Sequence, residues 1–124
     1  MMNRDETGKL VSEPEYEKEL ARISSAELGF EDHGIFGVNI NFEFESASQG
    51  TGWYTLNNLT GGKLLSAIMQ AAGVSRWEDL KGVPVYVLRD KGNPFGQIVG
   101  FEKLPINKQG GRIIFKDVFN KTGK

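Results

Sequence analysis

The chain has no cysteine and only one histidine among its 124 residues. Without cysteine the protein cannot form disulfides, zinc knuckles or a thiol nucleophile, and this composition fits a reducing cytosol. A single histidine also makes a poor transition-metal site, because such sites take several nitrogen or sulfur ligands. The sequence therefore predicts neither a bound metal nor another cofactor.

Long apolar runs and a dominant charge are missing as well. The longest apolar run is only a few residues, so we expect no membrane span and no secretory leader. Lysine and arginine number 15 against 16 aspartates and glutamates, and this balance argues against a uniformly basic nucleic-acid binder. The length fits one domain.

The near-zero net charge conceals an uneven distribution. Residues 1–45 carry −7, residues 46–102 carry +1 and residues 103–124 carry +5. Such asymmetry can reflect a charged partner, or two ends that attract each other or are simply solvated. The basic segment is interleaved with phenylalanine, which would suit a phosphate-bearing ligand; its cations are Lys103, Lys108, Arg112, Lys116, Lys121 and Lys124.

Alternation of apolar and polar residues predicts a mostly β domain. Residues 1–19 are expected to form a flexible acidic tail, residues 20–119 the single domain and residues 120–124 a basic tail. The clearest strand covers residues 38–45, where apolar and polar positions alternate strictly. Further strands are predicted at residues 22–28, 53–56, 84–88 and 97–101, with a last edge strand over 112–119 and a flexible segment at 46–52.

One main helix is predicted between the strands. Thr60 would cap it, Gly61 and Gly62 would begin it and Gly73 would end it. Its buried stripe is expected at Leu65, Ile68, Met69 and Ala72.

A second, shorter helical turn is predicted after the main helix, and together the elements define a fold class. Ser75 and Glu78 have the spacing of a capping box, which predicts the turn at residues 77–80. The order βββ-α-βββ then predicts an α+β domain with a strongly curved antiparallel sheet or a partly open β-barrel.

The glycine content, 16 residues, is about twice the usual ~7%, and one glycine pair is a candidate binding site. Gly61, Gly62 and Lys63 open the helix, so their backbone N–H groups and the lysine could bind an anion. The nucleotide-hydrolase signature fails, because Asn57 and Leu64 stand where that signature requires glycine and Ser or Thr. Turn chemistry alone could also explain these glycines.

Aromatic and basic residues supply further ligand-binding candidates. Trp53 and Tyr54 could stack on bases, and Arg76 could hold a phosphate. In a small domain most aromatic residues must fill the core, however, and we expect Trp77 and at least half of the phenylalanines there.

His33 is the remaining candidate, in the segment Glu31-Asp32-His33-Gly34. A neighbouring carboxylate could let it act as an acid or base, yet adjacent turn residues rarely point at one atom, so a turn-packing role competes. No Ser-His-Asp order or carboxylate pair stands out, and no catalytic residue is assigned.

Several motifs resemble those of small proteins encoded by bacteriophages and prophages. They are residues 28–35 (LGFEDHGI), residues 50–54 (GTGWY), residues 73–82 (GVSRWEDLKG) followed by 85–87, and Gly100. The resemblance covers roughly residues 20–104 and implies a viral origin and action in the cytoplasm of a bacterial host. It carries over no active site.

These observations lead to one main functional expectation and two alternatives. The main expectation is a non-enzymatic phage accessory protein that antagonises host immunity, either by sequestering a nucleotide-like signal or by blocking a defence protein. The first alternative is a single-stranded nucleic-acid-binding module that uses the basic segment and aromatic faces. The second is a hydrolase centred on His33. An exposed last strand could also pair across a two-fold axis to form a homo-oligomer.

Overall fold

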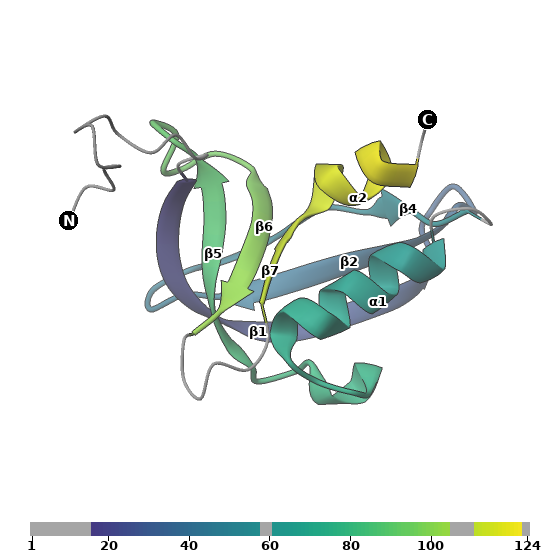
Figure 1. The fold of residues 1–124 in the computed structure, drawn as a ribbon, viewed down its shortest axis with the longest axis horizontal. Coiled ribbons are helices and arrows are strands. Elements are labelled where there is room, and N and C mark those ends of the chain that lie inside the picture. The colour runs from purple at the N-terminus through teal and green to yellow at the C-terminus, as the bar shows by residue number, and fades with distance from the viewer. Residues whose placement is uncertain (1–15, 58–60, 105–110, 123–124) are drawn as a thin grey trace, which may run out of the picture.

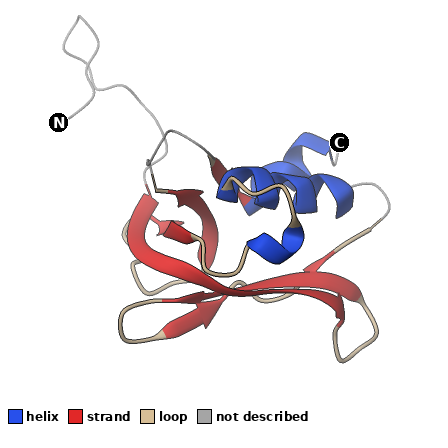
Figure 2. Ribbon diagram, turned by 90° about the horizontal axis from the view of Figure 1, so that it is seen from below, coloured by secondary structure: helices blue, strands red, loops and turns tan. Residues whose placement is uncertain are grey.

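Seven strands form one antiparallel sheet, and the helices gather on one side of it (Figures 1 and 2). The computed structural model describes residues 16–57, 61–104 and 111–122. The strands are β1 (Tyr16–Phe30), β2 (Phe36–Glu43), β3 (Ser48–Gly50), β4 (Tyr54–Thr55), β5 (Pro84–Asp90), β6 (Ile98–Lys103) and β7 (Arg112–Ile114). The helices are α1 (Gly61–Ala72), the short 3-10 helix η1 (Trp77–Asp79) and α2 (Phe115–Thr122).

The long strand β1 joins the two halves of the sheet. Its C-terminal part pairs with β2, from Arg22 to Phe30, and its N-terminal part pairs with β5, from Tyr16 to Arg22. The register with β2 shifts between Ile23 and Ser25, and such irregularities increase the local twist and bend of a strand. The strand visibly curves in Figure 1. It begins at Tyr16, so four residues assigned to the acidic tail belong to the sheet.

The predicted class of fold is confirmed in its main features. The strands follow the order β3-β2-β1-β5-β6-β7, with β4 also paired to β2, and the sheet does not close into a barrel. The order along the chain differs from the prediction, because four strands precede α1 and a second helix follows β7.

The core lies between the two halves of the curved sheet and beneath the helices. The Phe42 ring in β2 lies 5.8 Å from the Phe101 ring in β6, and Phe101 lies 6.3 Å from Phe115 of α2. With Phe44, four of the seven phenylalanines whose burial the structure describes are buried, which agrees with the expectation that at least half of them fill the core. Trp77 packs against the core and donates its indole N–H to the Ala26 carbonyl at 3.1 Å.

Helix α1 has the predicted bounds. Gly61 begins it, with its N–H donated to the Asn57 carbonyl at 2.9 Å. Gly73 follows its end with φ of 75°, a conformation that glycine adopts without steric cost. The predicted cap Thr60 lies outside the described residues.

The buried stripe of α1 is rotated from its predicted position. Leu65 and Met69 are only partly buried, and Leu64, fully buried, takes the central place against the sheet. Ile68 and Ala72 remain in the stripe, so the rotation is smaller than the ~100° between consecutive residues around the axis. The buried residues are Gly61, Leu64, Ile68, Ala71 and Ala72.

Two segments have a different structure from the predicted one. Residues 48–50 form strand β3 rather than a flexible loop, and Gly50 leaves room for the Asn41 amide where a Cβ would overlap it. The last strand predicted over residues 112–119 is present only as β7, at residues 112–114, and residues 115–122 form α2, in which Phe115 is buried while Lys116 and Asp117 face solvent. The assignment of residues 120–124 to a tail is therefore wrong as far as Thr122.

The short turn predicted at residues 77–80 is present as η1, but the capping box is not formed. The residue that precedes η1 is Arg76, and it makes no side-chain cap hydrogen bond. A single 3-10 turn instead closes through backbone bonds, such as the Leu80 N–H to the Trp77 carbonyl at 3.1 Å.

Candidate functional site

His33 lies in the turn between β1 and β2 and faces solvent. Its side chain is 84% exposed, and its Nδ1 lies 3.4 Å from the Glu31 carboxylate. The same carboxylate accepts a hydrogen bond from the His33 backbone N–H. Glu31 thus stabilises the turn. The predicted neighbouring carboxylate of His33 is present, and its contacts are structural.

The basic candidates lie at opposite ends of α1. Lys63 is exposed in the first turn, whereas Arg76 follows the C-terminal end. A helix of 12 residues is about 18 Å long, so the two cations cannot hold one small anion. Arg76 also lies 3.7 Å from Glu78 and 3.5 Å from Asp79, which offset its charge. Gly61 packs against Leu56, where an added Cβ would lie 3.4 Å from the leucine Cβ.

Trp53 and Tyr54 point to opposite faces of the sheet. Tyr54 pairs with Val38, whose side chain enters the core, and its ring lies 5.1 Å from Phe115. Burial raises the pKa of the Tyr54 hydroxyl. Trp53 is 44% exposed and lies beside Gly37 on the outer face. The structure therefore does not bring the predicted ligand-binding residues together.

An apolar surface that the sequence reasoning missed lies at the end of the β1–β2 hairpin. Along β2, Val38 and Ile40 are buried, but Phe36 in the same row is 40% exposed. Along β1 the exposed fraction rises from Leu28, at 42%, to Phe30, at 73%. We call Leu28, Phe30, Ile35 and Phe36 the hairpin surface.

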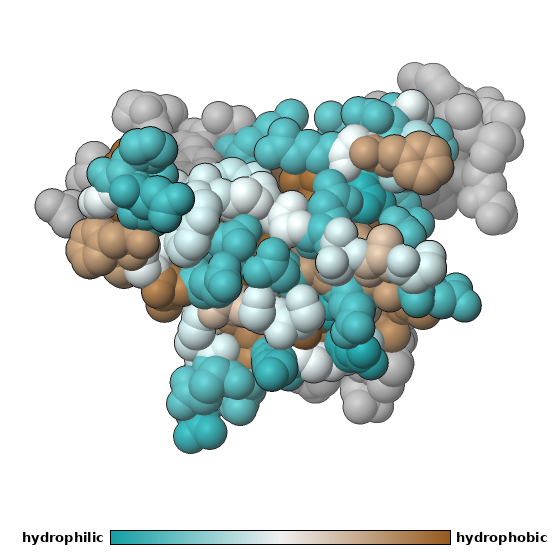
Figure 3. Space-filling model, turned by 180° about the vertical axis from the view of Figure 1, so that it is seen from behind, coloured by the Kyte–Doolittle hydropathy of each residue, from teal (hydrophilic) through white to brown (hydrophobic). Residues whose placement is uncertain are grey.

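The hairpin surface is formed by cross-strand packing. Phe30 pairs with Phe36 in the register, and their rings lie 5.2 Å apart. Figure 3 shows apolar side chains at this end of the molecule. Phe95, in the turn between β5 and β6, is a second exposed apolar position. Contiguous apolar surface of this kind marks interaction sites, whereas a single exposed ring is ordinary. The sequence signal for this surface was the same two-residue period of apolar residues that indicated the buried faces of the strands.

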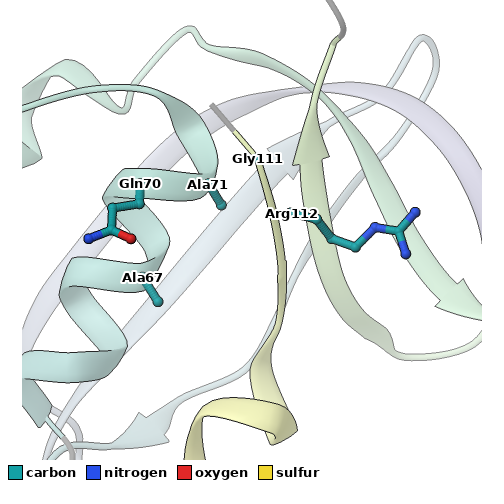
Figure 4. Close-up of a pocket in the computed structure, with 5 residues that line it drawn as sticks. All are labelled: Ala67, Gln70, Ala71, Gly111 and Arg112. Atoms are coloured by element: carbon teal, nitrogen blue, oxygen red, sulfur yellow. The ribbon is translucent and has the colours of Figure 1, made fainter. Parts of the chain in front are cut away.

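The hollow between α1 and β7 offers little to a ligand. It has a volume of about 390 Å³ and is lined by Ala67, Gln70, Ala71, Gly111 and Arg112. Figure 4 shows the Arg112 side chain directed away from the helix. The hollow is thus lined mainly by small and neutral side chains, and the Arg112 side chain lies on the opposite face of the sheet.

On that opposite face Arg112 and Lys18 share the carboxylate of Glu102. Lys18 Nζ lies 2.9 Å from one Glu102 oxygen, and Arg112 Nε lies 2.8 Å from the other. Burial alone would raise the pKa of Glu102, but the hydrogen bonds and charges of the two cations outweigh it and lower that pKa below its ordinary value of 4.5. The carboxylate is therefore ionised at neutral pH.

The described residues contain neither a cluster of metal ligands nor a membrane-spanning helix. Within residues 16–57, 61–104 and 111–122, His, Asp and Glu side chains form no group of three or more that could hold a metal ion. In those ranges no helix combines the length and the apolarity that crossing a bilayer requires.

No protein-family model, curated protein or solved structure matches the chain. The geometry of the described residues favours an exposed surface over a pocket as the candidate site.

Proposed function

We propose that this protein acts by binding another protein through the hairpin surface. The observation that carries the proposal is the exposure of Phe30, 73%, beside Phe36 and Leu28 on a row that is otherwise buried. Burying one phenylalanine contributes roughly 1.5–3 kcal/mol, so a partner that covers this row gains substantial free energy. Aromatic side chains in such positions often dominate an interface.

The partner that we propose is a defence protein of a bacterial host. Its support is the resemblance of the chain to small phage and prophage proteins, together with a surface suited to occupying another protein. The alternative of sequestering a nucleotide-like signal has less support, because Lys63, Arg76 and Trp53 lie apart. The hydrolase alternative rests on His33, which is exposed and braced by Glu31.

A phage-plating experiment tests the proposal. Bacteria that carry one defined defence system each would express the protein and be challenged with a phage which that system restricts. Wild-type protein is expected to restore plating against at least one system, and Phe30→Asp is expected to lower that plating by about tenfold or more, because the variant places a charge in the surface that the partner covers. Phe95→Asp is the matched control, because Phe95 is 96% exposed at a different turn.

The purified defence protein identified in this way provides the direct measurement. We expect Phe30→Asp to weaken its binding about 30-fold or more, as for a central aromatic contact, and Phe95→Asp to leave it unchanged. Equal plating by wild type and Phe30→Asp, with folding intact by circular dichroism, would contradict the proposal.

A further inference from the structure

In the N-terminal part of β1, acidic and basic side chains lie on opposite sides of the strand. Glu17 and Glu19 reach toward the β5–β6 turn, where they accept hydrogen bonds from the Gly92 N–H and from Arg89. Lys18 bonds Glu102 instead. Since side chains alternate along a strand, Tyr16, Lys18, Leu20 and Arg22 share the other side. The acidic N-terminal third of the sequence thus contributes a row of side chains whose only charges are the cations Lys18 and Arg22.

The register extends this row across three more strands. Leu20 pairs with Tyr86, Tyr86 with Glu102, and Glu102 with Arg112, so all four side chains lie on one face. The opposite face of the same strands carries the core residues Val87, Phe101 and Ile113. We call Tyr16, Lys18, Tyr86, Glu102 and Arg112 the tyrosine–cation face.

Each cation of this face lies over a tyrosine ring. Lys18 Nζ is 5.8 Å from the centre of the Tyr86 ring, and Arg112 Cζ is 5.7 Å from that of Tyr16. The side chains of Lys18 and Arg112 remain 45% and 41% exposed. Two cations against the single charge of Glu102 leave a net positive charge, and a guanidinium plane or tyrosine ring is a surface on which bases stack.

A hollow of about 640 Å³ adjoins the face where β1 bends. Leu20, Arg22 and Pro84 line it from the same side of the sheet as Tyr86, and Leu104 lines it as well. Glu19, Glu43 and Glu45 also line it, and Glu43 lies 2.8 Å from Arg22. Carboxylates repel phosphates but can accept hydrogen bonds from the amino groups of bases, so this hollow suits a base rather than a phosphate.

We propose that the tyrosine–cation face binds single-stranded nucleic acid. Lys18 and Arg112 contact phosphates, while bases stack on the tyrosine rings and the guanidinium plane. This surface is distinct from the hairpin surface and gives the protein a second binding activity. Its cations come from β1 and β7, so the basic C-terminal segment alone does not form it.

Fluorescence anisotropy with a labelled oligonucleotide of about 12 nucleotides and mixed sequence tests the inference. Wild-type affinity is expected to fall with salt between about 50 and 200 mM, with a logarithmic slope of about −0.7 for each phosphate contact. The double variant Lys18→Gln, Arg112→Gln is expected to reduce the magnitude of that slope by about 1.4. Tyr86→Leu is expected to weaken binding about fivefold or more at every salt concentration.

The control removes two cations elsewhere. Lys63 and Lys81 are exposed on α1 and after η1, so Lys63→Gln, Lys81→Gln changes the net charge equally. This control is expected to retain wild-type binding. Absence of binding by wild type, salt-independent binding, or an equal loss in the control would overturn the inference, and circular dichroism would show that each variant folds.

Discussion

Arg89 is a buried charged side chain whose polar atoms all have partners. It is only 4% exposed, at the end of β5. Its Nη1 donates to Glu19 at 2.8 Å, its Nε to the Gly96 carbonyl at 3.0 Å and its Nη2 to Gln49. The guanidinium also lies 5.2 Å from the Phe44 ring. One residue therefore holds β1, β3 and the β5–β6 turn together.

Removal of Arg89 is expected to destabilise the protein strongly. Arg89→Ala loses three hydrogen bonds and buried packing, so the free energy of unfolding should fall by about 2–4 kcal/mol. Arg22→Ala is the matched control, since the pair of Arg22 with Glu43 is more than half exposed on both sides, at 58% and 52%. Its effect should stay within about 1 kcal/mol. Urea unfolding followed by tryptophan fluorescence measures both, and similar losses would contradict a special role for Arg89.

At the scale of elements, the sequence predicts the strands and helices whose apolar period lies within their own residues. The alternation of β2 and the bounds of α1 could be predicted because each of these elements contains its complete apolar pattern. Strand β3 could not be predicted, since Ser48 to Gly50 become a strand only by pairing with Asn41 to Glu43. Helix α2 was missed because Phe115 and Val118 show a three-residue spacing that is too short to distinguish from a strand.

The candidate surfaces were harder to predict than the elements. Phe30 and Phe36 follow the same two-residue period as Val38, and only the three-dimensional extent of the core decides which of them stays exposed. The tyrosine–cation face depends on the pairing of β1, β5, β6 and β7, which are distant in sequence. Sequence reasoning identified the basic segment around Arg112 but assigned Lys18 to a tail.

Glu102 links three strands through ionic hydrogen bonds, and this link should depend on pH. Because its pKa in the folded protein is below 4.5, the unfolded chain binds more protons in that range, and stability rises with pH there. The contribution is complete above pH 4.5 and is lost as the pH falls through the lowered pKa. Glu102→Gln should therefore be less stable than wild type at neutral pH, and the difference should narrow below 4.5. Urea unfolding of both proteins at neutral pH and below pH 4.5 measures this difference in stability. A difference that stays constant would contradict the pH dependence of the ionic link.

At the scale of the whole molecule, β1 separates two surfaces of different chemistry. The hairpin surface lies at its C-terminal end and the tyrosine–cation face at its N-terminal end. Lys18 and Phe30 are separated by a strand length of up to about 40 Å, at ~3.3 Å per residue. The tyrosine–cation face carries two cations and one carboxylate, whereas Leu28, Phe30, Ile35 and Phe36 of the hairpin surface are uncharged. A protein partner and a nucleic acid can occupy such surfaces together.

The two surfaces should therefore act independently. Variants more than about 7–10 Å apart with no shared partners usually have additive effects within about 0.5 kcal/mol, or roughly twofold in affinity. Phe30→Asp should leave oligonucleotide affinity within that range, and Lys18→Gln, Arg112→Gln should do the same for the protein partner. The combined variant should lose both activities by the factors of its parents. Displacement of the protein partner by a saturating oligonucleotide, measured by anisotropy, would show instead that the two surfaces do not act independently.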